Sequence, residues 1–394
     1  MRRWLALGLC LLAMLLLGAA AAEEVAGKDI AKQCTVTVSD NKRYKALLFD
    51  KNYIHCWEGD PGETIRVTAP KGTEVQGIQV SFRNQPVRLT VTCDEETLGV
   101  YDWEYYTNYL PFTHPVDHFT VTVDPDAEHS AQINRLRIVS EGQLPDWVQQ
   151  WQELTEPADL MVIATHPDDE LLWFGGMLPT YAGEQKKRVQ VVYMVGNTNY
   201  RRCELLAGLW ACGVRYYPVL GTFPDKSAGS MRATRKEWGE TAPEEFLTEV
   251  LKKYKPQVIA TQDVKGEYGH AHHRVTVEAV LNVVAALNED SEWAASCQAA
   301  YGTMRPAKLY VHLWKENQIT FNWREPLDAF DGKTSLEVAR AAFREHVSQQ
   351  KGKYHVLDSG RLNCSLFGLY WSAVGPDEVS EDLFEHLESA PSEV

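Results

Sequence analysis

The sequence has little basic charge and no long hydrophobic run. Its 39 Lys and Arg residues are outnumbered by 54 Asp and Glu residues, which gives a formal net charge of −15. This balance argues against nucleic acid or an anionic membrane surface as the main partner, because both attract cationic proteins. The most sustained apolar stretch, residues 4–17, is shorter than the roughly 20 residues that a membrane-spanning helix needs. The sequence therefore argues against a multi-span membrane protein and favours a globular one.

Closely spaced cysteine pairs are also missing. The eight cysteines include no C-x-x-C motif, so a zinc cluster built from cysteines has little support. Cys10 lies inside the apolar stretch, and its removal by processing would leave seven cysteines. An odd number in an exported protein implies at least one free thiol or an intermolecular bridge.

The first residues are typical of a secretory signal. Arg2 and Arg3 precede the apolar stretch, and small residues at 18–22 follow it, as signal peptidase requires. We therefore predict a signal peptide at residues 1–22 and a secreted location, extracellular or periplasmic. Cleavage would change the formal charge from −15 to −17 through the loss of Arg2 and Arg3, and it would leave no integral membrane span.

Residues 30–142 are predicted to form a β-sandwich. Short runs of alternating and β-branched residues recur there, and turn sequences such as Pro61-Gly62 separate them. Short strands at regular spacing are typical of sandwich domains. The predicted strands are 35–38, 64–67, 78–82, 87–91, 119–123 and 136–139.

This region resembles the discoidin-like (galactose-binding-like) jelly roll. Residues 48–57 are similar to the early loop of those domains, and residues 131–138 are similar to their closing strand. The resemblance implies a jelly-roll fold with a carbohydrate-binding role. Aromatic side chains can stack on sugars, although aromatics in a sandwich more often fill the core. The aromatic residues for which both roles are open are Trp57, Trp103, Tyr105, Tyr106 and Tyr109.

The character of the sequence changes after this region. We expect residues 143–158 to form a helical connector, and residues 159–388 to form a domain in which strands and helices alternate. Continuous apolar strands between helices predict a layered α/β domain with a mostly parallel, Rossmann-like sheet. The expected strands are 160–164, 189–195, 214–220, 257–261 and 308–314. The expected helices are 170–181, 201–211, 243–254, 274–287 and 335–347.

A dense polar cluster follows the first of these strands. His166, Asp168, Asp169 and Glu170 lie where a buried strand ends and a helix is expected to begin. Ligands of open α/β sheets bind at the carboxyl ends of the strands. Packing such groups together is costly unless they are paired or bind a metal. Imidazole and carboxylate are ligands of Zn²⁺, and His166 and Asp169 are close enough in sequence to reach one ion.

A second cluster follows the strand at 257–261. The segment 266–273 reads Gly-Glu-Tyr-Gly-His-Ala-His-His, and it opens another expected helix. His270 and His273 are three residues apart and can share a helical face. His272 is their rival as a ligand. Two histidines and one aspartate would leave a fourth zinc position open for water, as catalytic zinc sites require.

Together the two clusters resemble the signatures of the PIG-L/LmbE-like zinc-dependent de-N-acetylases. The likeness covers roughly residues 159–385. It implies an LmbE-like fold and a hydrolase that cleaves the acetamide of an N-acetylated sugar, of the N-acetylglucosamine type. Carried over by matched position, the implied zinc ligands are His166, Asp169 and His273.

The same resemblance implies roles for the neighbouring residues. Asp168 would act as general base, Tyr268 as an oxyanion donor, and His270 would face the oxyanion or the leaving amine. His272 stands where the family often has Asp or Gln, so the local electrostatics differ. Glu170 is expected to support the site. Arg201 is expected to pair with Glu204 or with the loop, and contact with the substrate is the alternative.

Two other functions remain open at this point. The chain could be a carbohydrate-binding or adhesion protein whose α/β domain is catalytically silent, although the presence of Asp168 speaks against this. It could also be a zinc amidohydrolase that acts on a non-sugar amide. Export and the jelly roll favour an extracellular glycan as the substrate and partner.

Overall fold

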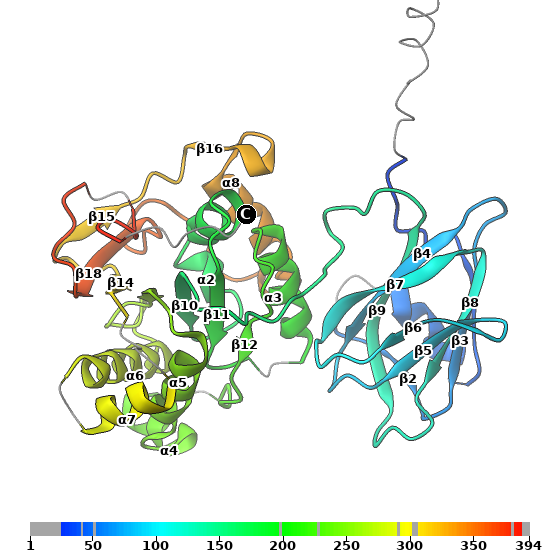
Figure 1. Ribbon diagram of the computed structural model, residues 1–394, viewed down its shortest axis with the longest axis horizontal. Helices are drawn as coiled ribbons and strands as arrows, with labels where there is room; N and C mark the ends of the chain where they lie inside the picture. Colours follow the sequence, from blue (N-terminus) through cyan, green and yellow to red (C-terminus); the bar gives the residue numbers. More distant parts are fainter. Residues whose placement is uncertain are drawn as a thin grey trace, which may run out of the picture.

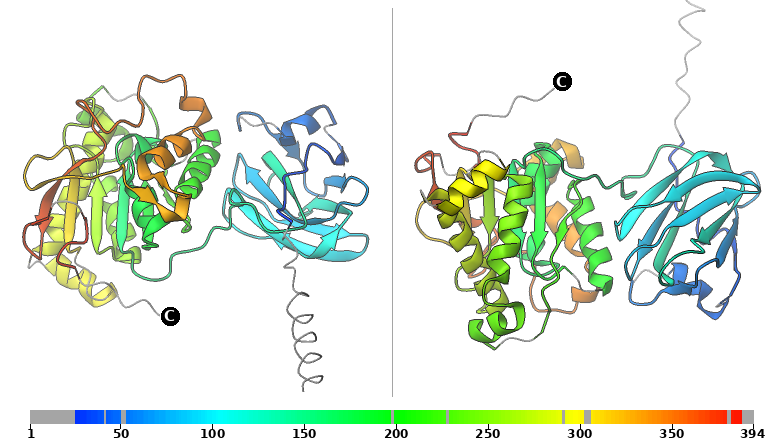
Figure 2. Two further views of the ribbon diagram at one scale, coloured as in Figure 1. Left: turned by 90° about the horizontal axis from the view of Figure 1, so that it is seen from above. Right: turned by 60° about the horizontal axis from the view of Figure 1, so that its bottom comes forward.

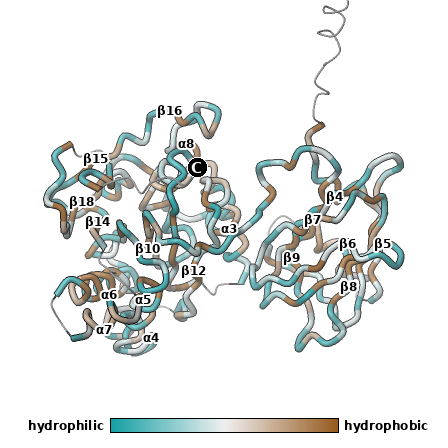
Figure 3. The backbone as a smooth tube through the Cα atoms, in the orientation of Figure 1, coloured by the Kyte–Doolittle hydropathy of each residue, from teal (hydrophilic) through white to brown (hydrophobic). Residues whose placement is uncertain are grey.

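Figure 1 shows a β-rich body and a mixed α/β body lying side by side. The computed structural model describes residues 25–40, 42–49, 53–196, 199–226, 229–289, 292–301, 306–379 and 382–387. The expected signal peptide, residues 1–22, lies outside the described residues. In both bodies the hydrophobic segments lie mainly in strands and helices, and the connecting loops are largely hydrophilic (Figure 3).

The first body is a sandwich of two antiparallel sheets, as predicted. One sheet has the order β1-β3-β8-β5-β6 and the other has the order β2-β9-β4-β7. The first sheet consists of β1 (Thr35–Val38), β3 (Thr64–Thr68), β8 (His118–Val123), β5 (Leu89–Cys93) and β6 (Glu96–Tyr101). The second consists of β2 (Trp57–Gly59), β9 (Ala131–Ser140), β4 (Val75–Phe82) and β7 (Thr107–Val116). A 3-10 helix, η1 (Lys42–Phe49), contacts β9 and β2.

Apolar side chains at alternate positions of the strands fill the space between these two sheets. In β8 every second side chain is buried, namely Phe119, Val121 and Val123. Side chains of a strand point alternately to its two faces, so this pattern places one face in the core. Trp57 is fully buried in the same core, which makes it a packing residue and removes it as a sugar platform.

The second body contains a seven-stranded sheet in the order β12-β11-β10-β13-β14-β18-β15. The first five strands are parallel. At one edge β18 pairs antiparallel with β14, and β15 pairs antiparallel with β18. The mostly parallel sheet is therefore confirmed. Its strands are β12 (Val219–Leu220), β11 (Val189–Tyr193), β10 (Leu160–Ala164), β13 (Val258–Thr261), β14 (Lys308–His312), β18 (Leu366–Ser372) and β15 (Gln318–Thr320).

Helices cover both faces of this sheet (Figure 2). Leu160 and Val162 of β10 pack into the core on one face, and Met161 and Ile163 pack into the core on the other. The first face is covered by α2 (Asp169–Leu172), α3 (Asn199–Ala211) and α8 (Ser335–Phe343). The second is covered by α4 (Met231–Trp238), α5 (Ala242–Tyr254), α6 (Ala271–Asn288) and α7 (Glu292–Tyr301). Burial on both faces explains why β10 is apolar throughout.

The expected helix at 170–181 is wrong in detail. Helix α2 ends at Leu172, turns follow, and a π-helical segment, η2 (Pro179–Glu184), begins later. Gly175 adopts φ 53°, a conformation that an α-helix does not contain. A Cβ at this position would lie 2.5 Å from the sulfur of Cys364, so close packing also requires the glycine.

The expected helical connector at 143–158 is also wrong, because these residues contain no helix. Their backbone bonds to the sandwich instead. The Tyr109 N–H donates to the Gln149 carbonyl at 2.8 Å, and the Trp151 N–H donates to Asn108 Oδ1 at 3.0 Å. These tertiary hydrogen bonds satisfy the groups that a local helix would have used.

The two bodies meet at helix α3 and at Tyr217, which follows it. Tyr105 of the sandwich stacks on Tyr217 with ring centroids 4.2 Å apart, and the Arg202 guanidinium lies 3.9 Å from the centre of the Tyr106 ring. Tyr105 and Tyr106 therefore serve the domain interface. Tyr109 is buried, and Trp103 is 37% exposed.

The described part of the chain contains neither a disulfide nor a helix that could span a membrane. Its seven cysteines are all free thiols, and Cys203, Cys212, Cys297 and Cys364 are buried. None of the helices described is both long and apolar enough to cross a membrane.

Candidate metal centre and active site

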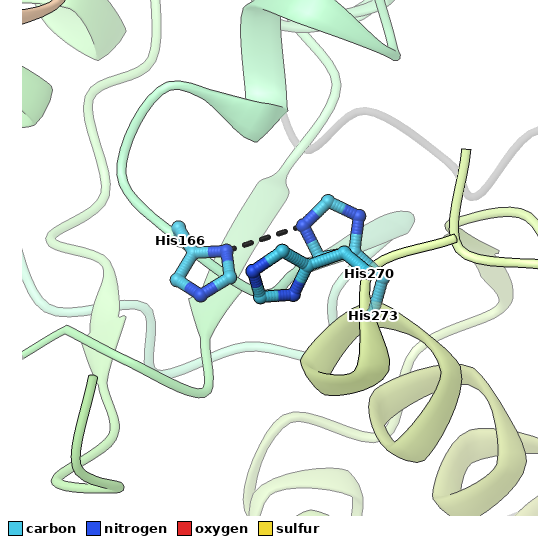
Figure 4. Close-up of side chains that lie close together, drawn as sticks. All are labelled: His166, His270 and His273. Atoms are coloured by element: carbon cyan, nitrogen blue, oxygen red, sulfur yellow. Dashed lines mark hydrogen bonds between the residues drawn. The ribbon is translucent and has the colours of Figure 1, made fainter. Parts of the chain in front are cut away.

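The two polar clusters meet at the carboxyl edge of the parallel sheet. Strands β10 and β13 are direct neighbours, so the loops that follow them lie next to each other. His166 comes from the first loop, and His270 and His273 come from the start of α6 (Figure 4). Gly266 has φ 71°, and a Cβ there would lie 2.5 Å from the His270 carbonyl oxygen. The tight turn before α6 therefore requires glycine at this position.

Three atoms of His166, Asp169 and His273 form a nearly equilateral triangle. His166 Nδ1 lies 3.2 Å from His273 Nε2, and both nitrogens lie 3.3 Å from Asp169 Oδ2. A tetrahedral zinc ion with ligands at about 2.0–2.1 Å spaces neighbouring ligand atoms about 3.3–3.4 Å apart. All three residues are buried. The donor types and the spacing thus fit one face of a zinc tetrahedron.

Carboxylates and hydrogen bonds orient these donors. His273 Nδ1 donates to Glu267 Oε2 at 2.5 Å, which leaves the Nε2 lone pair for the triangle. His312 Nδ1 lies 3.2 Å from the other oxygen of Glu267. Burial disfavours the charged form of Glu267, but His273 and His312 lower the pKa of this carboxyl below its usual value. No role was predicted for Glu267 from the sequence, although this residue lies inside the second motif.

Asp169 is held as tightly as the histidines. The backbone N–H of His166 donates to Asp169 Oδ2 at 2.7 Å, and the Trp173 indole N–H donates to Asp169 Oδ1 at 2.6 Å. Burial alone would raise the pKa of Asp169, but His273 and His166 lower it below its usual range. The side chain is therefore a preoriented carboxylate.

His272 lies on the other side of His166. Its Nδ1 is 3.1 Å from His166 Nε2, the ring nitrogen that points away from the triangle. Asp225 Oδ1 is 3.5 Å from the same His166 nitrogen and 4.0 Å from His272 Nδ1. His272 and Asp225 therefore lie on the Nε2 side of the His166 ring, and the triangle lies on its Nδ1 side. Asp225 belongs to no recognisable motif, so the sequence alone could not assign it.

Asp168 adjoins the triangle in an unusual backbone conformation. Its φ is 108°, and its side chain is almost fully buried. Arg201 Nη2 lies 3.1 Å from Asp168 Oδ1. Burial raises the pKa of Asp168 to about 7, although Arg201 acts in the opposite direction. A carboxyl with this pKa can both accept and release a proton near neutral pH.

Glu170 supports this backbone conformation, as expected. The Asp168 N–H donates to Glu170 Oε2 at 2.8 Å, and His346 Nε2 lies 2.8 Å from the other oxygen of Glu170. Arg201 also donates to the Pro167 carbonyl, so it pairs with the loop. Glu204 instead accepts hydrogen bonds from Ser348.

His270 and Tyr268 lie at the mouth of the site. The His270 ring centroid is 4.9 Å from that of His166 and 4.8 Å from that of His273. Burial and these imidazoles lower the pKa of His270 to about 3, so its ring is neutral. Tyr268 is 36% exposed and stacks on Tyr354. Burial and the nearby Asp169 and Asp168 raise the pKa of Tyr268, so its phenol keeps its proton.

A cavity of about 850 Å³ adjoins this mouth. Tyr268 and Glu267, which contacts His273, are among the residues that line it. Among the other lining residues are Trp314, Gln318, Lys315, Glu316 and Arg361. Such a mixture of aromatic and polar side chains suits a polar ligand with flat apolar faces.

Comparison with known proteins adds a family match. The model of the PIG-L family, described as GlcNAc-PI de-N-acetylase, matches residues 161–284. The 1D-myo-inositol 2-acetamido-2-deoxy-alpha-D-glucopyranoside deacetylase of Actinosynnema mirum is 30% identical over 161 residues, which are 34% of this chain and 57% of that protein. The chain spans 56–57% of the length of three such curated relatives.

Two solved structures are similar to the two bodies. The N,N'-diacetylchitobiose deacetylase of Pyrococcus horikoshii matches 50% of this chain and 72% of its own, with 18% identity and a TM-score of 0.35. CpGH89CBM32-6 of Clostridium perfringens matches 28% of this chain and 98% of its own, with 12% identity and a TM-score of 0.25. With the family match and the geometry of the two loops, residues 161–284 are identified as a PIG-L domain.

Proposed function

We propose that this protein is an exported, zinc-dependent de-N-acetylase that hydrolyses the acetamide of an N-acetylated sugar to acetate and a free amine. The observation that carries the proposal is the triangle of His166, Asp169 and His273 with Asp168 beside it, inside the region that matches the PIG-L family. Export rests on the sequence of residues 1–22.

In this proposal His166, Asp169 and His273 hold one zinc ion. Bound zinc would supply a water of lowered pKa and would polarise the acetamide carbonyl. The protein residues fix the three donors and leave a fourth position for water or substrate. Glu267 acts behind His273 as the carboxylate of a carboxylate–histidine pair, which fixes the ring orientation and raises the basicity of its Nε2.

Glu267→Gln is expected to lower zinc affinity by about 10–100-fold, because a neutral amide makes the imidazole of His273 a weaker donor. The dissociation constant is measured by competition with a chelator. Glu316→Gln, on the wall of the same cavity, is the matched control and should leave the affinity unchanged. Equal affinities in Glu267→Gln and the wild type would remove Glu267 from the metal centre.

Asp168 moves the proton. Its carboxylate accepts a proton from the attacking water and returns it to the leaving amine, a cycle for which a pKa of about 7 is suited. Arg201 holds one carboxylate oxygen and favours the ionised form before each turnover.

Arg201→Ala is expected to shift the acid limb of the pH profile to higher pH. An adjacent guanidinium lowers a carboxyl pKa by about 1–3 units, so its removal raises the pKa of Asp168 and depletes the base form at low pH. The measurement is kcat/KM as a function of pH, which reports the free enzyme. Arg201→Lys should restore part of the shift. An unchanged acid limb would show that Arg201 does not act through Asp168.

Tyr268 and His270 stabilise the charge that develops on the carbonyl oxygen. Tyr268 keeps its proton and can donate it in a hydrogen bond. The backbone N–H of His272 donates to His270 Nδ1 at 3.2 Å. The neutral His270 ring therefore carries its proton on Nε2 and can also donate a hydrogen bond. One such donor is typically worth about 2.7–4 kcal/mol in the transition state.

The cavity beside Tyr268 supports a sugar as the substrate. Tyr268 and Trp314 offer aromatic faces, and charged groups such as Glu316 and Arg361 can bind hydroxyls. A cavity of about 850 Å³ also accommodates more than the acetamide alone.

Acetate release tests the proposal. The mature protein is incubated with N-acetylglucosamine, chito-oligomers and N-acetylated host-type glycans, with and without a chelator and added zinc. Release that a chelator abolishes and zinc restores is the expected result. Zinc binding without release from any sugar would favour a non-sugar amide as the substrate. Absence of both zinc binding and release would favour the silent carbohydrate-binding protein.

A further inference from the structure

A second set of metal-type donors lies in the sandwich, away from the PIG-L domain. Cys93 ends strand β5, Asp94 begins the turn that follows, and His118 begins strand β8. One donor atom from each residue lies within 4.8 Å of the other two. Cys93 Sγ is 3.6 Å from His118 Nε2, and Asp94 Oδ1 is 3.4 Å from the same nitrogen.

The strand pairing brings these residues together. Strands β5 and β8 are antiparallel neighbours, with Thr92 opposite Thr120, so the end of one lies beside the start of the other. Cys93 pairs with Glu96 across a two-residue hairpin turn. Asp94 occupies that turn at φ 49°, a conformation that aspartate tolerates better than most residues. The backbone, and not only flexible side chains, therefore sets the positions of the donors.

The distances of His118 Nε2 from the other two donors match a zinc tetrahedron. With zinc–sulfur bonds of about 2.3 Å and zinc–nitrogen and zinc–oxygen bonds of about 2.0–2.2 Å, neighbouring sulfur and nitrogen ligands lie about 3.5–3.6 Å apart, and nitrogen and oxygen ligands about 3.3–3.5 Å apart. The observed separations are 3.6 Å and 3.4 Å. A thiolate in the set disfavours calcium and magnesium, which prefer oxygen donors alone.

A neighbouring carboxylate prepares the histidine for this role. His118 Nδ1 lies 2.7 Å from Asp117 Oδ1 and donates to it, which leaves the Nε2 lone pair facing Cys93 and Asp94. The carboxylates of Asp117 and Asp94 both lie within 3.4 Å of His118 ring nitrogens, and a divalent ion that binds here would displace the thiol proton of Cys93.

We propose that Cys93, Asp94 and His118 form a second metal site, which binds a divalent transition ion such as Zn²⁺ and keeps its fourth position open to solvent. His118 and Asp94 remain substantially exposed, with side chains 46% and 83% accessible, so the ion can enter from the surface. The bound ion would link the turn between β5 and β6 to the start of β8. The site does not depend on the proposed catalytic function.

Cobalt binding to the mature full-length chain tests this site. Equilibrium dialysis gives the number of Co²⁺ ions per chain, and absorption reports a thiolate-to-cobalt charge-transfer band that the cysteine-free catalytic centre cannot produce. We expect two ions and the band in the wild type, and one ion without the band in Cys93→Ser. His118→Gln, at an exposed position, should lose the same ion, whereas Cys56→Ser and His129→Gln are matched controls that should retain two.

Two further variants separate this inference from the catalytic proposal. His273→Ala should retain one ion and the thiolate band, whatever its activity. Asp117→Asn should weaken binding at the sandwich site by about 10–100-fold. A wild-type chain without the thiolate band, or a band that survives Cys93→Ser or His118→Gln, would overturn the assignment.

Discussion

Asp168→Asn is expected to lower kcat by about 10²–10⁴-fold while zinc content stays at the wild-type level. This fold-change is typical of the loss of a general base, because the side-chain amide of asparagine cannot accept the proton of the attacking water. Zinc should remain because Asp168 is not one of the three triangle residues, His166, Asp169 and His273. Asparagine is the informative substitution, since Asp168 has φ 108° and alanine would add backbone strain to the chemical change.

Asp331→Asn provides a matched control for this variant. Asp331 also has a positive φ, 56°, and it follows η3 (Asp328–Phe330), outside the two loops of the site. The activity and the zinc content of the Asp331→Asn variant should equal those of the wild type. Activity within about twofold of the wild type in Asp168→Asn would exclude Asp168 as the base. Loss of zinc in that variant would instead make Asp168 a ligand.

The sequence was sufficient for the class of each domain and for the sheet edge at which the candidate site lies. Apolar strands such as β10 and β13 are buried on both faces, and this burial leaves a continuous hydrophobic pattern that is readable without a structure. A parallel sheet then places every strand-to-helix loop at one edge. That His166 and His273 lie on adjacent loops follows from the pairing of β10 with β13, which the structure supplies.

The partners of the candidate ligands could not be predicted in the same way. Glu267 contacts His273 only because the turn at Gly266 folds the loop back onto α6. Asp225 reaches His166 from the segment between β12 and α4, which has no motif and is far away in sequence. Arg201 reaches Asp168 because the start of α3 packs beside the first loop. Each of these contacts depends on tertiary placement and leaves no local periodicity.

For the connector at residues 143–158, a local sequence pattern led to a wrong prediction of a helix. The aromatic character of the segment from Trp147 to Trp151 was interpreted as part of a helical connector. Instead, the Arg137 guanidinium lies over the Trp147 ring, with its carbon 4.3 Å from the ring centre. Trp151 packs edge-on against Trp210. The two rings thus contact different domains, and an extended chain can deliver them to both. Tertiary contacts of this kind override helix propensity, which is a weak preference.

His273→Ala is expected to abolish zinc binding at the catalytic centre and to reduce activity by about 10³-fold or more. Removal of His273 leaves His166 and Asp169, too few protein donors for a catalytic zinc. The lost polarisation by the metal is worth several kcal/mol, which corresponds to at least this factor. The zinc count is made in a Cys93→Ser background, so that only the catalytic centre contributes.

His272→Ala is the matched control, since it removes an adjacent imidazole of the same helix. His272 Nδ1 faces His166 Nε2, and the triangle is formed by His166 Nδ1, so zinc should remain near one per chain in His272→Ala. The reverse result, zinc retained in His273→Ala and lost in His272→Ala, would move the ion to the side of His166 that faces Asp225. Asp168 and Tyr268 would then have to act on an ion bound at a different nitrogen of His166, and the proposed proton path through Asp168 would fail with the ligand assignment.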